Sequence, residues 1–231
     1  MKNKEKNKRN RKGLLMIRMG LLLIAAALFL VVYNFYEEQR AQKEAGWTLS
    51  KLESVIFPET AGESAIDQGA GTGTGLSGEK PSSVQEQAVI PDYILSPDME
   101  MPMETIDGKA YIGILSLPSL GLELPVISKW SYSGLRTAPC RYSGSAYQNN
   151  LIICGHNYAS HFGSLKRLRE GDPAVFTDVD GNVFTYRMVE REILLPTSVE
   201  EMESGSWDLT LFTCTIGGQS RVTVRFERED D

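Results

Sequence analysis

Two residues that could cooperate in nucleophilic catalysis lie at the ends of apolar segments. His156 follows the segment LIICG, and Cys214 ends the segment LTLFTC. We expect both segments to be strands, which places both side chains where a strand meets a loop, a common position for catalytic groups. A cysteine nucleophile needs a base or counter-ion, and His156 is one of only two histidines in the chain. Strand position alone is equally consistent with purely structural roles for His156 and Cys214 and with catalytic ones.

The same residue types do not indicate a metal site. Cys154, His156 and His161 match no recognised zinc spacing and lack a fourth ligand. The acidic pair that begins at Asp178 is not a calcium loop, because Gly181 comes two positions too early. We therefore expect no metal and no other cofactor.

Short strands would position these side chains. Asp180 and Gly181 form the strongest hairpin signal, and Ser198 with Glu201 has the pattern of a capping box that opens a short helix. A second helical pattern lies in SHFGSLKRLRE. The pattern predicts a mainly β domain over residues 106–231, a closed or nearly closed barrel with two or three short helices. The segments interpreted as strands lie in AYIGILSLPSLGLELPVI, NNLIICG, PAVFTD, GNVFTYRMVEREIL, WDLTLFTC and SRVTVRFER.

Charge is divided unevenly along the chain. Residues 1–18 hold eight Lys and Arg against one Glu, whereas the whole chain has a net charge of −6. The remainder is therefore strongly acidic, which argues against nucleic acid as a partner because phosphate binding needs a positive surface.

Residues 19–36 form an uncharged apolar segment that is long enough to cross a bilayer as a helix. The basic cluster before it and Glu37 and Glu38 after it predict a single-pass anchor in the cell membrane with the amino terminus in the cytoplasm. A cleaved signal peptide would need a shorter apolar region and a small-x-small cleavage site. We therefore expect an uncleaved anchor with the rest of the chain outside the cell.

Residues 37–105 are expected to separate the membrane from the domain. Residues 37–56 favour a short frayed helix, and residues 59–88 are rich in Gly, Ser, Thr and acidic residues, as in a disordered linker. A flexible stretch of this kind would let the domain sweep a shell above the membrane.

The chain has three cysteines, Cys140, Cys154 and Cys214, so at least one cannot be in an internal disulfide. An unpaired thiol outside the cell is a candidate nucleophile. We interpret Cys140 and Cys154 as small buried residues. A bridge between them stays open, because its geometry cannot be derived from sequence.

Over nearly all of residues 110–228 the sequence resembles the sortase family. The segments that carry this resemblance are YIGILSLPSLGLELPVI, NNLIICGHN, DLTLFTC and SRVTVRF. The family's Thr-Leu-x-Thr-Cys strand matches Thr210–Cys214, its strand ending in Gly-His matches Gly155 and His156, and its arginine on the next strand matches Arg221. The resemblance implies an eight-stranded barrel behind an amino-terminal signal anchor.

The resemblance also implies a cysteine transpeptidase at the surface of a Gram-positive-type cell. Cys214 would attack a Leu-Pro-x-Thr-Gly-like sorting signal of a surface protein and hold it as a thioacyl intermediate. An amine of a peptidoglycan precursor or of a pilin would then take over the acyl group. His156 would transfer protons, Arg221 would bind the oxyanion or the peptide, and Thr213 would line the substrate groove.

Several alternatives stay open from sequence. The short loop between Cys214 and Arg221 leaves the subclass undecided, and both a hydrolytic cysteine peptidase and a catalytically silent barrel scaffold are consistent with the pattern. Arg225 shares a strand face with Arg221, but Arg221 directly follows the turn after Cys214 and is favoured. The alternate positions of that strand, expected to face inward or to pack on neighbours, are Val222, Val224 and Phe226.

Overall fold

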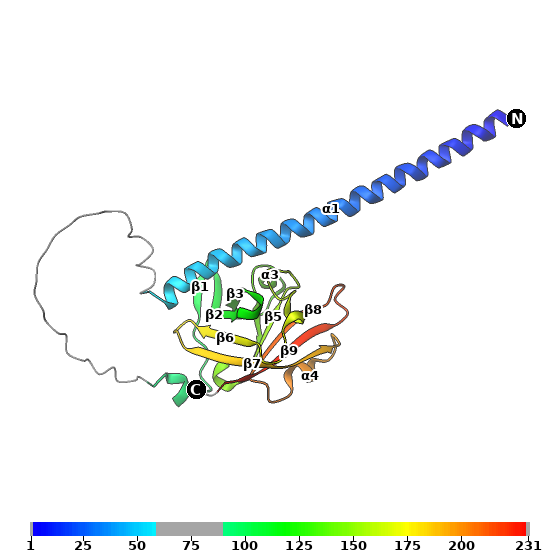
Figure 1. The fold of residues 1–231 in the computed structure, drawn as a ribbon. Helices are drawn as coiled ribbons and strands as arrows, with labels where there is room; N and C mark the ends of the chain where they lie inside the picture. Colours follow the sequence, from blue (N-terminus) through cyan, green and yellow to red (C-terminus); the bar gives the residue numbers. More distant parts are fainter. Residues whose placement is uncertain (1, 59–89, 230–231) are drawn as a thin grey trace, which may run out of the picture.

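The computed structural model describes residues 2–58 and 90–229, which form one long helix and a β-barrel (Figure 1). The linker expected at residues 59–88 lies outside the described residues. The helices are α1 (Lys2–Ile56), α2 (Asp92–Leu95), α3 (Tyr132–Leu135) and α4 (Val199–Glu203), with 3-10 turns η2 (Pro118–Leu120), η3 (Ala146–Gln148) and η4 (Leu165–Arg167). The strands are β1 (Glu104–Ile106), β2 (Lys109–Leu117), β3 (Leu122–Ile127), β4 (Cys140–Ser143), β5 (Leu151–Gly155), β6 (Pro173–Asp178), β7 (Val183–Leu194), β8 (Leu209–Cys214) and β9 (Arg221–Arg228).

The strands close into a barrel. Their order is β1-β2-β3-β4-β5-β8-β9-β7-β6, and a further antiparallel pairing between β2 and β6 joins the two sides. Strands β2 to β9 therefore form an eight-stranded ring, and β1 adds a ninth strand beside β2. The expected eight-stranded barrel is confirmed.

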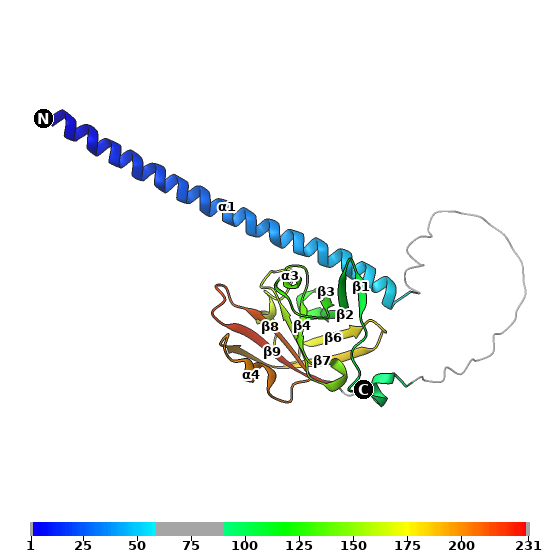
Figure 2. The ribbon, with the colours of Figure 1, turned by 180° about the vertical axis from the view of Figure 1, so that it is seen from behind.

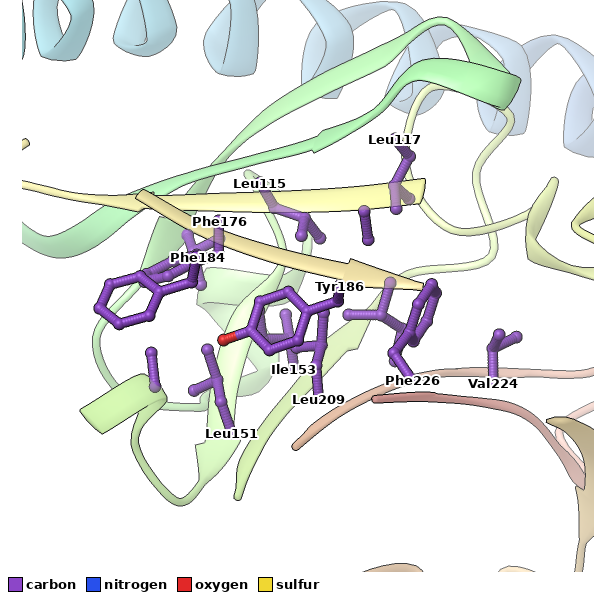
Figure 3. Packing of buried hydrophobic residues seen from close by; sticks show 14 of the residues in the cluster. Leu115, Leu117, Leu151, Ile153, Phe176, Phe184, Tyr186, Leu209, Val224 and Phe226 are labelled. Carbon is purple, nitrogen blue, oxygen red and sulfur yellow. The ribbon is translucent and has the colours of Figure 1, made fainter. Parts of the chain in front are cut away.

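The barrel interior is filled by alternate residues of the strands (Figure 3). On β8 and β9 the inward-facing side chains are Leu209, Leu211, Val222, Val224 and Phe226, all buried in one apolar cluster. The inward orientation predicted for the β9 residues is confirmed. Because side chains alternate along a strand, Phe212 and Cys214 on β8 and Arg221 and Arg225 on β9 face the outside of the barrel.

The β6–β7 hairpin has the turn that the sequence indicates. Gly181 has a φ of +85°, which favours glycine. The buried Asp178 carboxylate accepts hydrogen bonds from the Asp180 and Asn182 backbone amides at 3.0 and 2.9 Å and from the Tyr147 hydroxyl at 2.7 Å. Asp178 is thus a structural acceptor that fixes the turn.

The two helical patterns form only partly. Helix α4 begins after Ser198, but the Ser198 side chain makes no capping hydrogen bond, so the capping box is absent. The segment SHFGSLKRLRE contains the single turn η4, and its apolar residues pack into the barrel core. Those core residues are Phe162, Leu165 and Leu168.

Helix α1 continues without a break from the apolar segment onto the barrel (Figures 1 and 2). Its apolar part is exposed, and the length and composition of the helix suit a membrane span. Residues 37–56 belong to the same helix instead of forming a separate frayed one. The spacing of Ala41, Ala45, Thr48 and Leu52 places them on one face, and all four are buried.

The docked face of α1 explains this difference from the expected flexible tether. Leu52 packs in a cluster with Tyr111, Ile127, Cys140 and Cys154, on the outer side of β2 to β5. Small side chains at the two alanines allow close approach of the helix to the barrel, a packing contribution that is not apparent from the scattered apolar positions alone.

Residues before position 106 also pack on the barrel. Met101 is buried in the interior cluster, and the Tyr93 ring stacks on Tyr147 with the ring centroids 4.6 Å apart. After residue 89, the part of the chain that packs on the barrel therefore begins near α2.

Replacement of Leu52 by Ala tests the docking of α1. Leu52 is fully buried, so the truncation should weaken docking by about 2–5 kcal/mol. Hydrogen exchange of the full-length protein in detergent should then show faster exchange over residues 41–56. Val55→Ala is the matched control, because Val55 is 48% exposed. Equal exchange in the two variants would contradict the docked arrangement.

Candidate active site

Strand β8 lies between β5 and β9, and this arrangement gathers three of the predicted site residues. The parallel pairing with β5 places Gly155 opposite Thr213, so the next residue, His156, lies at the level of Cys214. The antiparallel pairing with β9 places Arg221 opposite Cys214. Side chains of directly opposed residues have Cβ atoms about 4.5–5.5 Å apart. The three residues therefore lie at the same end of the barrel.

The Cys214 thiol is exposed in a pocket of about 180 Å³. Arg221 also lines this pocket, together with residues from the loop after β3, α3, β4, β5 and the segment around α4. Much of the lining is apolar, and several of its large side chains are exposed instead of being buried in a core. These are Trp130, Tyr132, Leu195 and Val199. The arrangement suits an extended peptide with apolar residues next to the reacting bond.

The Arg221 guanidinium lies beside Cys214 and keeps N–H donors that are available to a ligand. Its Nη1 donates to the carbonyl oxygens of Gly218 and Ser220, both at 3.2 Å. Within residues 2–58 and 90–229, Nε and Nη2 of Arg221 have no protein acceptor. Arg221 can therefore still donate to an oxyanion or to a peptide carbonyl in the pocket.

The Arg225 guanidinium is committed to the protein. Its side chain is only 2% exposed, and it donates to the Glu192 carboxylate at 2.8 Å and to the Thr210 hydroxyl at 3.0 Å. Two further bonds reach the carbonyl oxygens of Met202 and Glu201 at 2.9 and 2.7 Å. Arg225 thus ties β9 to β7, β8 and α4, and its donors are not available to a substrate.

The His156 imidazole lies next to the pocket without lining it. Its ring stacks on Tyr158 with the centroids 3.8 Å apart and the planes 16° from parallel. Nδ1 is buried, and among the described residues it has no hydrogen-bond partner. In the same part of the chain no hydrogen bond joins His156 to Cys214. Contacts of this kind are often long in unliganded enzymes and tighten with substrate.

The electrostatic surroundings of His156 favour its neutral form. Burial lowers the pKa of His156 below its ordinary value of 6.5, and the positive charge of Arg136 lowers this pKa further. The imidazole is therefore largely neutral at pH 7. A neutral imidazole can accept a proton from a thiol.

Thr213 contributes to the pocket lining, but its side chain is only 3% exposed. It alternates with the outward-facing Phe212 and Cys214, so it faces the barrel interior with Leu211. Its hydroxyl is buried and has no partner within the described ranges. A direct contact of this hydroxyl with substrate is therefore not provided by the observed arrangement.

The remaining thiols and the second histidine are buried. Cys140 and Cys154 are opposite each other on β4 and β5, and both are free. Burial raises the pKa of Cys140 to about 11 and also raises the pKa of Cys154, so both stay protonated and unreactive at pH 7. Burial lowers the pKa of His161 to about 4. The described residues hold no cluster of three His, Cys, Asp or Glu that could bind a metal ion.

Sequence reasoning missed the neighbours of the three central residues. Arg136 and Tyr158 act on His156 from the α3 end and from the loop after β5. Trp130 and Tyr132 form an exposed aromatic pair beside Cys214. The one signal was the sequence WSY between two expected strands, where two large aromatic rings stand in a loop.

Comparisons with known proteins relate the barrel to a known family. Residues 115–229 match the family model described as the sortase domain. Over 125 residues the chain is 29% identical to Sortase A of Bacillus anthracis, which covers 51% of this chain and 59% of that protein. The chain thus spans less than two thirds of that relative.

Solved structures with a similar arrangement are also sortases. Sortase A from Corynebacterium diphtheriae is 24% identical with a TM-score of 0.49 and covers 53% of this chain and 62% of its own. Sortase C-3 from Streptococcus pneumoniae is 30% identical with a TM-score of 0.46 and covers 58% of this chain and 72% of its own.

Replacement of Arg136 by Gln tests the electrostatics of His156. Removal of a nearby positive charge should raise the pKa of His156, because the imidazolium form is no longer repelled. An NMR pH titration of the His156 ring signals measures this shift. Arg167→Gln removes an exposed charge that does not act on His156 and should leave its titration unchanged. A His156 pKa that stayed the same or fell in Arg136→Gln would disprove this assignment.

Proposed function

The chain belongs to the sortase family, and we propose from this premise that it is a cysteine transpeptidase that cuts a sorting peptide and joins it to an amine. The observation that carries the proposal is the exposed Cys214 thiol, which is paired across two strands with Arg221 in an apolar pocket. Cys140 and Cys154 are buried, and burial keeps both thiols protonated.

In the first step Cys214 attacks the carbonyl carbon of the threonine in a Leu-Pro-x-Thr-Gly-like signal. His156 accepts the thiol proton, and the carbonyl oxygen becomes an oxyanion. The unpaired N–H groups of Arg221 donate to this oxyanion. His156 then gives its proton to the leaving glycine nitrogen, the peptide bond breaks, and a thioester with Cys214 is left.

In the second step an amine attacks the thioester carbonyl. His156 takes a proton from the attacking nitrogen and returns it to the Cys214 sulfur as the thioester breaks. The product is a new amide bond, and the enzyme is restored without any cofactor. An amine of a peptidoglycan precursor or of a pilin fits this role.

The apolar pocket supports the choice of substrate. Leu195 and Val199 are 63% and 47% exposed before β8, beside the Cys214 thiol. Burial of a leucine and a proline of the signal against these side chains would supply binding free energy of about 25 cal/mol per Å² of apolar area.

The amino-terminal helix supports a location at the cell membrane. The large apolar side chains of α1 from residue 14 to residue 36 are exposed, and the helix is apolar and long enough to cross a bilayer. Basic residues before the span would hold the amino terminus in the cytoplasm and place the barrel outside the cell.

Incubation of the protein with a Leu-Pro-x-Thr-Gly peptide and candidate amines tests the proposal. We expect a ligated product that is absent with Cys214→Ala, while Cys140→Ala and Cys154→Ala keep measurable turnover. Mass spectrometry of the products measures this, and circular dichroism checks that Cys214→Ala is folded. Cleavage without ligation under all amines would instead identify a hydrolytic peptidase, and near-normal turnover by Cys214→Ala would contradict the proposal.

The paired variants Arg221→Lys and Arg225→Lys separate catalysis from stability. Lysine keeps the charge but loses the planar set of donors, so Arg221→Lys should lower the rate by a factor on the order of 10² with little change in unfolding. Arg225→Lys loses buried hydrogen bonds and should lower the free energy of unfolding by at least about 2 kcal/mol. Peptide turnover and urea unfolding measure the two effects. A severe rate defect of a folded Arg225→Lys beside a normal Arg221→Lys would transfer the role to Arg225.

A further inference from the structure

Helix α1 fixes the height of the active site above the membrane that the helix is proposed to cross. The apolar span ends near Tyr36, and the same unbroken helix packs on the barrel from Ala41 to Leu52. The two segments have no break between them that could act as a hinge. The α1 residue that a barrel residue contacts therefore indicates how far that barrel residue lies from the end of the span.

Two contacts place the Cys214 end of the barrel at the end of the span. The Glu38 carboxylate accepts a hydrogen bond from the Ala159 backbone amide at 2.7 Å, in the loop that follows His156. Tyr132 lines a cleft of about 740 Å³ between α1 and the barrel, and the α1 residues of this cleft run from Glu37 to Thr48. At a helical rise of 1.5 Å per residue, Glu38 lies about 3 Å from Tyr36 along the helix axis. Figures 1 and 2 likewise show α3 and the β8–β9 loop on the side of the barrel that faces the amino-terminal part of α1.

Trp130 and Tyr132, which we call the aromatic rim, are exposed at this level. Their ring centroids are 4.9 Å apart, and Tyr132 is 79% exposed. Tryptophan and tyrosine rings are enriched at the membrane–water interface, where one part of the ring is apolar and the other is hydrated. Lys129 and Arg136 flank the rim and are also exposed, as cations beside anionic headgroups would be.

The aromatic rim belongs to the active-site pocket as well. Trp130 and Tyr132 line the pocket that contains the Cys214 thiol, and Tyr132 lines the cleft against α1. Ile216, two residues after Cys214, is 90% exposed at the same end of the barrel. The pocket therefore opens beside the rim, on the side where α1 enters the bilayer.

We propose that the aromatic rim lies in the headgroup region of the membrane that α1 crosses, so that the Cys214 pocket takes reactants held at the bilayer surface. The proposal rests on the transpeptidase function and on α1 as a membrane span. It adds the bilayer interface as the partner of this face. A domain on a long flexible tether would not hold its pocket at the bilayer surface.

Tryptophan fluorescence of the full-length protein in vesicles tests the proposal. The vesicles contain phosphatidylcholine and phosphatidylglycerol, with or without lipid that carries bromine near the headgroup. The double variant Trp47→Phe, Trp207→Phe leaves Trp130 as the reporter, and brominated lipid should remove most of its emission. The matched control is Trp47→Phe, Trp130→Phe, which reports from Trp207. That residue lies before β8 at the end opposite Cys214, about 23 Å away at strand rise, and should keep its emission.

Lys129→Glu in the Trp130 reporter variant gives a second measurement. Lys129 does not line the Cys214 pocket, so turnover of a soluble peptide should stay within a factor of about two, since a single exposed charge contributes little. Quenching of Trp130 should fall in the anionic vesicles because the new carboxylate is repelled by the headgroups. Emission that acrylamide quenches but brominated lipid does not, or equal lipid quenching of Trp130 and Trp207, would overturn the membrane contact. Peptide ligation in those same vesicles would show that the transpeptidase function stands even if the membrane contact fails.

Discussion

The backbone pairing of β8 with β5 on one side and β9 on the other is the constraint on which the site depends. The parallel register with β5 brings His156 to the level of Cys214, and the antiparallel register with β9 brings Arg221 opposite Cys214. A shift of one residue in either register would turn the outward-facing side chains into the barrel core. The apolar interior made by Leu211, Val224 and their neighbours excludes such a shift. The packing of the barrel therefore also determines which side chains lie beside Cys214.

The packing of α1 on the barrel is the second constraint, and it links the proposed membrane span to the site. Ala41, Ala45, Thr48 and Leu52 form a continuous buried face, and Glu38 reaches the loop after His156. The Cys214 end of the barrel is therefore held both by strand pairing and by packing against α1. If α1 crosses the membrane as proposed, the orientation of the barrel above the bilayer follows from the geometry of this helix.

The sequence predicted the features that depend on short-range patterns. Alternation predicted the inward side chains of β9 and hence the shared outer face of Arg221 and Arg225, and Asp180 with Gly181 predicted the β6–β7 turn. It could not predict features that arise only when distant segments meet. The burial of Arg225 by α4, the inward hydroxyl of Thr213 and the docking of α1 are tertiary contacts, and so is the effect of Arg136 on His156.

In the proposed reaction Cys214 is the residue that carries the peptide between the two steps. Its most direct test is mass spectrometry of the protein incubated with a Leu-Pro-x-Thr-Gly peptide in the absence of amine and quenched in acid. We predict an added acyl mass on the proteolytic fragment that contains Cys214, and this mass should be lost on treatment with hydroxylamine because a thioester is cleaved by this nucleophile. An acyl group on Cys140, Cys154 or any other residue, or peptide cleavage with no covalent adduct at all, would contradict it.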